Sequence, residues 1–188
     1  MLFKGNQFYS HALLRINYTT YDLRHENDSI NPRTDHCNIM LLAQNDGSGS
    51  ATSHPFCYAR VLGIYHANII LTGPESSDYQ SRRLEFLWVR WLELLEIAPA
   101  AGFEDCSLDK GRFVPTDLED AFGFVDPADV LRSCHLVPAF ADGQQRVDGI
   151  ATSRNSRDSD EWKHYYINRC VSMQTYHLLI SLIEFCAA

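Results

Sequence analysis

Apolar segments separated by polar turns divide the chain into strand-sized pieces. Residues 13–24, LLRINYTTYDLR, carry β-branched and aromatic side chains at the density typical of a strand, and the turn-rich ENDSINPRTDH that follows predicts a long loop. A short apolar run at residues 37–43, CNIMLLA, predicts a second strand that ends in a surface loop rich in Gly, Ser and Asn. This pattern favours a β-rich domain.

The middle of the chain predicts longer strands. Residues 56–71, FCYARVLGIYHANIIL, indicate one bent strand or two short ones, with Gly63 at the bulge or bend. In residues 82–91, RRLEFLWVRW, both alternating sets of side chains are mainly apolar. We therefore expect a strand that is covered on both sides, with one face filling a barrel and the other lying under another segment. Residues 92–102 fit either a helix or a loop.

The sequence around residue 126 indicates the start of a helix. Asp126 is placed to cap a helix, Pro127 suits the first helical position, and Asp129 lies near the positive end of the helix dipole. These residues predict a short helix over 127–134.

The last quarter of the chain has a weaker pattern. Residues 141–161 lack an apolar period and predict a surface excursion. The apolar end of the chain, residues 171–188, reads as an amphipathic helix or an altered tail. We therefore expect a domain over 8–140, followed by the excursion and a variable helical tail over 141–188.

Composition supports a single core and limits the partners. The chain has 188 residues, of which 45% are hydrophobic and 12% aromatic, enough for one sizeable domain. Its 16 basic and 24 acidic residues give a formal charge of −8, so the whole chain is no electrostatic match for a polyphosphate backbone. DNA binding would need a local patch, for which Arg82, Arg83 and Lys163 are the candidates.

Other features suggest an intracellular location. The N-terminus lacks the pattern of a secretory signal, and no apolar run approaches membrane-spanning length. Six widely spread cysteines are typical of reduced, buried thiols.

Two resemblances appear in the ordered phrases of the chain. The series YARVLGIYH, EFLWVRW and DPADVLRSCHLVPAF resembles the core of a BAH (bromo-adjacent homology) domain over about residues 37–140. LLRINYTTYDLR, RRLEFLWVRW and EWKHYYINR resemble the C-terminal region of uncharacterised proteins of mushroom-forming fungi that are associated with Plavaka-type transposons of the CACTA class. The second resemblance covers most of residues 8–170, and the tail after EWKHYYINR departs from it.

The BAH resemblance implies a small SH3-like β-barrel and a binding surface. In cage-bearing members, aromatic faces surround a methylated lysine and an acid balances its charge. Trp91 matches the cage tryptophan, and Glu93 or Glu96 is placed to be the acid, but Cys57 stands where the family pattern has an aromatic residue. The alternative is that the tryptophans belong to the core.

We therefore expect a mainly β, BAH-like domain with short helices and long loops that acts without catalysis in the nucleus. A groove near Trp91, Tyr58 and Tyr65, with Glu93 and Glu96, would bind a histone tail or another basic protein segment.

Three alternatives remain open. In these alternatives, the chain would be an accessory DNA-binding part of a transposase, an accessory catalytic part such as a nuclease, or a decayed fragment without activity. A metal-dependent nuclease would use the acids of one loop and helix start, which capping and solvation also explain. These acids are Asp117, Glu119, Asp120, Asp126 and Asp129.

No metal or other cofactor is expected. Zinc accepts the ligand types of His36, Cys37, His54 and Cys57, but their spacing matches no zinc finger.

Overall fold

Strands make up most of the described chain. The computed structural model describes residues 1–19, 25–43, 54–72, 79–95, 108–145 and 161–169. Within these ranges the strands are β1 to β11, and the helical segments are single 3-10 turns. The predicted mainly β class is confirmed.

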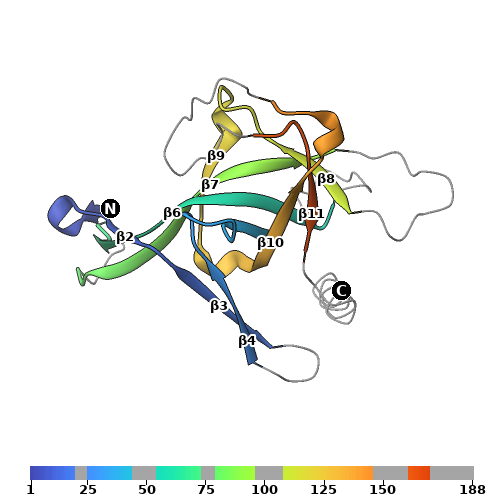
Figure 1. Cartoon of the computed structure of the whole chain (residues 1–188). Coiled ribbons are helices and arrows are strands. Elements are labelled where there is room, and N and C mark those ends of the chain that lie inside the picture. Colours follow the sequence, from blue (N-terminus) through green and yellow to red (C-terminus); the bar gives the residue numbers. More distant parts are fainter. Residues whose placement is uncertain (20–24, 44–53, 73–78, 96–107, 146–160, 170–188) are drawn as a thin grey trace, which may run out of the picture.

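Six antiparallel strands form a closed circuit of pairings. From β6 the circuit passes through β5, β10, β11, β8 and β7, and β7 pairs with β6 again. We call these six strands the ring (Figure 1). They are β5 (Asn38–Leu42), β6 (Phe56–Ile70), β7 (Arg82–Leu94), β8 (Asp109–Phe113), β10 (Val130–Pro138) and β11 (Tyr165–Asn168).

One apolar cluster draws residues from all six strands of the ring. Because every strand of the ring contributes a buried side chain to this cluster, the cluster fills the interior that the circuit of strands encloses. Its buried members are Met40, Phe56, Tyr58, Leu92, Phe113, Cys134, Tyr165 and Ile167.

A second apolar cluster lies on the outer side of β5, β6 and β7. On β7, Leu87 and Val89 belong to this outer cluster, whereas Leu92 belongs to the inner one. Ile30, Val125 and Val130 from other segments complete the outer cluster. The prediction that residues 82–91 are covered on both faces is therefore confirmed for residues 86–91, whereas residues 82–85 are exposed.

Beyond the ring, β6 and β7 continue as a long arm, seen on the left of Figure 1. There β1 (Leu2–Phe3) and β2 (Tyr9–His11), joined by the 3-10 turn η1 (Lys4–Asn6), pair with β6. On the other edge of β7 lies β9 (Phe122–Val125), which follows the turn η2 (Glu119–Ala121).

The predicted bend at Gly63 is also confirmed. The register between β6 and β7 shifts between Val61 and Gly63, which marks a bulge. A Cβ atom at Gly63 would lie 2.4 Å from Cε2 of Tyr65, so the glycine lets the Tyr65 ring lie directly on the backbone.

One predicted loop is a strand. Residues 26–36 were predicted to form a loop, but β4 (His25–Ile30) pairs along its whole length with β3 (Leu14–Thr19) in a hairpin that projects from the ring (Figure 1). The polar sequence is tolerated because the carboxylate of Asp28 accepts a hydrogen bond from the Ser133 backbone nitrogen at 2.9 Å, which anchors the hairpin to β10.

The predicted helix over 127–134 is wrong beyond its first turn. Asp126 caps as expected, accepting from the Ala128 nitrogen at 2.8 Å, but the 3-10 turn η3 ends after Pro127–Asp129. From Val130 the chain is β10, which pairs with β5 on one edge and β11 on the other. Sheet pairing with distant strands therefore overrides the local helix signal.

Part of the segment assigned to an excursion and tail belongs to the sheet. After the turn η4 (Phe140–Asp142), Gln144 forms a bridge with Trp162, and β11 pairs with both β10 and β8. The sequence-based boundary at residue 140 missed this strand because only four residues form it. The predicted helical tail and most of the excursion lie outside the described residues.

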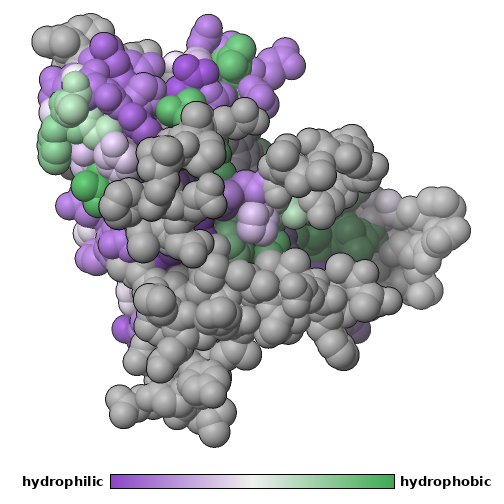
Figure 2. Space-filling view, turned by 90° about the vertical axis from the view of Figure 1, so that its right-hand side faces the viewer, coloured by the Kyte–Doolittle hydropathy of each residue, from purple (hydrophilic) through white to green (hydrophobic). Residues whose placement is uncertain are grey.

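Figure 2 faces the side of the molecule that carries β8 and β11. Most of the described surface there is hydrophilic, and hydrophobic residues show within a hollow. Among the described residues, no helix has the length and hydrophobicity needed to span a membrane.

Candidate functional site

An open groove lies beside Trp91, on the outer side of the ring. It has a volume of about 640 Å³ and runs between the ends of β5, β6 and β7 on one side and the β9–η3–β10 segment on the other. We call it the Trp91 groove. Its lining includes Leu41, Leu42, Cys57, Trp91, Val125, Asp126, Asp129 and Leu131.

The floor of the Trp91 groove is apolar. Leu41 and Val125 are buried, and Trp91 is half-buried against the same outer cluster. Burial raises the pKa of the Cys57 thiol above its ordinary 9.0, so this residue adds no charge near neutral pH. Leu42 at one wall is 47% exposed. The floor can therefore accept an apolar side chain of a ligand, which would lie next to the Trp91 ring.

Close backbone approach fixes the position of Trp91. A Cβ atom on Gly123 would lie 2.5 Å from the indole nitrogen of Trp91, so only a glycine in β9 leaves room for the ring. Gly123 pairs with Val89, the outward-facing residue two positions before Trp91. The indole is thus held between β7 and β9.

The wall formed by η3 is acidic. Asp126 and Asp129 are both exposed, and one carboxylate oxygen of Asp126 is used in the cap of η3. Among the described residues that line the groove, none is a lysine or arginine. The groove therefore offers negative charge next to an apolar floor, an arrangement that suits a cation attached to an apolar segment.

Of the four predicted ligand-binding residues that the structure describes, only Trp91 lines this groove. Tyr58 is fully buried inside the ring, where its hydroxyl donates to Asp109 at 2.9 Å. Tyr65 lies in the arm, stacked on Phe86.

The one predicted acid that the structure describes, Glu93, is not in the groove either. Glu93 forms an ion pair with Arg112 on β8, and Glu96 lies outside the described residues. Sequence patterns do not indicate that Asp126 and Asp129 line the groove, because they predict a helix over residues 127–134.

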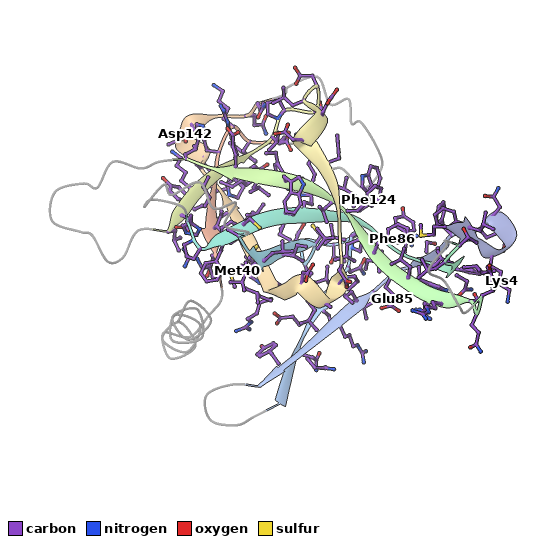
Figure 3. The ribbon with its side chains drawn as sticks, turned by 180° about the vertical axis from the view of Figure 1, so that it is seen from behind. Lys4, Met40, Glu85, Phe86, Phe124 and Asp142 are labelled. Atoms are coloured by element: carbon purple, nitrogen blue, oxygen red, sulfur yellow. The ribbon has the colours of Figure 1, made fainter. Side chains whose placement is uncertain are left out.

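The candidate nucleic-acid residues are divided between two ends of the molecule. Arg82 and Arg83 begin β7 in the arm, near β1. Lys163 lies beside Gly143, whose carbonyl accepts from its backbone nitrogen. Lys4 of the arm and Asp142 of the turn that precedes Gly143 lie at opposite ends in Figure 3. The structure therefore does not gather these three side chains into one patch.

The acids considered for catalysis are also spread. Asp126 and Asp129 line the Trp91 groove, while Asp117, Glu119 and Asp120 are exposed in the turn before β9. Among the described residues, no three His, Cys, Asp or Glu side chains lie together in a way that could hold a metal ion.

A cluster that the sequence did not reveal surrounds Asp109. Its carboxylate accepts from the Tyr58 hydroxyl and from Arg169, and it lies 3.2 Å from Nε2 of His54. The other ring nitrogen of His54 lies 2.8 Å from the carbonyl oxygen of Phe56. Both nitrogens of the imidazole are engaged, so this cluster links the segments that carry His54, Tyr58, Asp109 and Arg169.

The charges in the Asp109 cluster shift both pKa values. The hydrogen bond with Asp109 is the largest effect on His54 and raises the pKa of the imidazole above 6.5, against burial, which lowers it. Burial would raise the pKa of Asp109, but the hydrogen bonds from His54 and Arg169 outweigh it and lower the pKa to about 2. The cluster is therefore most stable with His54 protonated and Asp109 ionised.

No protein-family model, curated protein or solved structure matches the chain.

Proposed function

We propose that this chain is a non-enzymatic interaction module that binds a basic protein segment, such as a histone tail, in the Trp91 groove. The observation that carries this proposal is the combination of a half-buried tryptophan on an apolar floor with two exposed carboxylates, Asp126 and Asp129, on the adjacent wall. An apolar side chain of the partner would fill the floor, and a neighbouring lysine or arginine would meet the acids.

The finer architecture that we propose is a small, BAH-like or SH3-like barrel. Its support is the closed circuit of six antiparallel strands around a single interior cluster. With the resemblance of the ordered phrases to BAH domains and to Plavaka-associated fungal proteins, this favours a nuclear, transposon-associated protein that contacts chromatin.

An aromatic cage is not part of the proposal. Phe124 also lines the groove, but it pairs with Trp88 in register, and its ring contacts Phe86 at 5.7 Å between centroids. Opposed residues of paired strands share a face, so Phe124 faces away from Trp91. Recognition of a basic segment then does not depend on lysine methylation.

The test is the affinity of the full chain for histone-tail peptides, measured by calorimetry at physiological salt. Trp91→Ala should weaken binding at least about tenfold, as expected for an aromatic anchor. Trp88→Ala is the matched control, because Trp88 is also half-buried on β7 but lies on the other face. Equal affinities for the wild type and Trp91→Ala, with both proteins folded, would contradict the placement of the site.

A further inference from the structure

The arm carries a strand edge with unused pairing capacity. Along one edge, β7 pairs with β6 from Arg82 to Leu92. Along the other edge, β9 begins to pair at Leu87. No strand of the described residues pairs with the segment Arg83–Phe86 on this second edge. We call this segment the free edge. An unpaired edge presents backbone N–H and C=O groups that can template another strand.

The two faces of the free edge differ in character. Arg83 and Glu85 lie on one face, about half exposed, with 2.7 Å between the arginine Nε and the glutamate Oε1. Leu84 and Phe86 lie on the other face, where Leu84 is 37% exposed and the Phe86 ring contacts Phe8.

That second face continues as an exposed aromatic surface. The Phe86 ring also contacts Phe124, which is 72% exposed, and Phe8 is 60% exposed. Figure 3 shows Phe86 and Phe124 close together near the junction of the arm and the ring. A strand added to the free edge would therefore extend a face that is already apolar.

We infer that the free edge binds a second copy of this chain, with the two β7 strands antiparallel and Leu84 facing Leu84 across a twofold axis. The pairing register of the two strands selects this arrangement. A twofold axis perpendicular to the sheet keeps each face of one copy continuous with the same face of the other. Side chains alternate along a strand, so each residue then opposes one of the same parity. The axis must accordingly pass through a residue position of the free edge. An axis at Phe86 would require Leu87 to pair, although Leu87 already pairs with Val125 of β9, which leaves Arg83, Leu84 or Glu85.

Two of these three registers are disfavoured. An axis at Arg83 would set two guanidinium groups directly opposite each other, and like charges in that position are destabilising. An axis at Glu85 would oppose two carboxylates and would also require Leu87 to pair, although Leu87 already pairs with Val125 of β9. Only the axis at Leu84 avoids both conflicts.

The register centred on Leu84 makes the edge complementary to itself. Arg83 of each copy lies opposite Glu85 of the other, so the two intrachain pairs become four alternating charges across the axis. On the other face the two Leu84 side chains meet at the axis, between the two Phe86 rings. The pairing of Leu87 with Val125 ends the intermolecular strand at the point where the free edge ends.

The contact is short, so association should be moderate and depend on concentration. Interfaces below about 1,200 Å² of buried surface are typical of weak or transient complexes. Sedimentation velocity of the full chain, over a concentration range of about two orders of magnitude, should show a reversible shift from monomer to dimer. A protein that stays monomeric throughout this range overturns the proposal.

Charge reversal tests the register. Glu85→Arg places an arginine opposite Arg83 of the second copy and should weaken dimerisation at least about tenfold, as should Arg83→Glu. The double variant R83E/E85R restores opposite charges at both positions and should recover the dimer. Glu119→Arg, the same charge change at an exposed residue outside the free edge, is the control and should dimerise like the wild type.

The single and double charge-reversal variants together test the Leu84 register. Loss in both single variants with recovery in the double variant supports the Leu84 register. A dimer that survives Glu85→Arg, or one that the double variant fails to restore while remaining folded by circular dichroism, overturns it.

Discussion

Arg90 and Glu161, which are 71 residues apart in the chain, form a two-pronged ion pair in the interior of the protein. The guanidinium donates to the carboxylate at 2.7 and 3.2 Å, and each side chain is only 2% exposed. Arg90 also donates to the Val114 carbonyl and lies over the Phe113 ring. The pair therefore ties the segment before β11 to β7.

Breaking the Arg90–Glu161 pair should be costly. Glu161→Leu leaves a buried guanidinium without its main counter-charge, and we expect the free energy of unfolding to fall by about 3 to 5 kcal/mol. Urea denaturation followed by circular dichroism measures this loss.

A double variant separates the loss of attraction from the cost of a lone charge. Arg90→Met combined with Glu161→Leu removes both buried charges and should recover most of the stability. If Glu161→Leu costs less than about 1 kcal/mol, or if the two losses simply add, the pair does not have this structural role.

The Asp109 cluster predicts a stability that falls both as the pH rises above 6.5 and as it falls below 3.8. The pKa of His54 is raised in the folded state, so its contribution is complete below 6.5 and is lost as the pH rises through the folded pKa. The pKa of Asp109 is lowered to about 2, so its contribution is present above 3.8 and is lost as the pH falls toward 2. Melting temperatures across this pH range measure both effects.

Asp109→Asn should flatten both limbs of that profile, because the amide neither charges nor raises the pKa of His54. His54→Gln should flatten the alkaline limb and leave most of the acid limb, since Arg169 still bonds to Asp109. Identical pH profiles for the wild type and Asp109→Asn would show that the cluster does not couple to folding.

Gly123 should be intolerant of a methyl group. In Gly123→Ala the new Cβ would lie 2.5 Å from the indole nitrogen of Trp91, and the ring would have to move. We expect a loss of about 1 to 3 kcal/mol in stability, as for other overpacked sites, and weaker peptide binding. Thermal melting and peptide titration measure the two effects.

The smaller ring of Trp91→Phe should relieve the clash. In the Trp91→Phe background, adding Gly123→Ala should cost clearly less than it does in the wild type. Equal costs in both backgrounds would mean that Gly123 does not position the indole.

The acidic wall of the Trp91 groove should make binding sensitive to salt. Asp126→Asn keeps a capping side chain at η3 but removes a charge, and Asp129→Asn removes the second charge. Each change should weaken peptide affinity by less than about tenfold, because exposed charges contribute modestly. The double variant with both substitutions should show a weaker dependence of affinity on salt concentration. An unchanged dependence would show that the two acids do not contribute to binding.

The features that could be predicted from the sequence are those set by neighbouring residues. The apolar residues of 82–91 define a strand whose two faces are covered from residue 86 onward, Gly63 marks a bulge, and Asp126 marks a cap. Each of these features depends on side-chain alternation or on local backbone chemistry, and both properties are visible in a short stretch of sequence.

The features that could not be predicted depend on contacts between distant residues. The polar strand His25–Ile30 is recognisable only once it pairs with β3, and Val130–Pro138 becomes a strand only between β5 and β11. The same limit applies to the site. Trp91 was proposed from the resemblance of its strand to BAH domains, but Asp126 reaches its groove only through the path of the η3 turn.

The most direct test of the central claim observes the three tryptophans during titration with a basic histone-tail peptide. Each indole N–H gives one signal in a two-dimensional ¹H–¹⁵N NMR spectrum of the full chain. If the peptide binds in the Trp91 groove, the Trp91 signal should shift with saturation while those of Trp88 and Trp162 stay in place. A saturating titration that leaves Trp91 unmoved, or that shifts Trp88 or Trp162 instead, would contradict a binding site in the Trp91 groove.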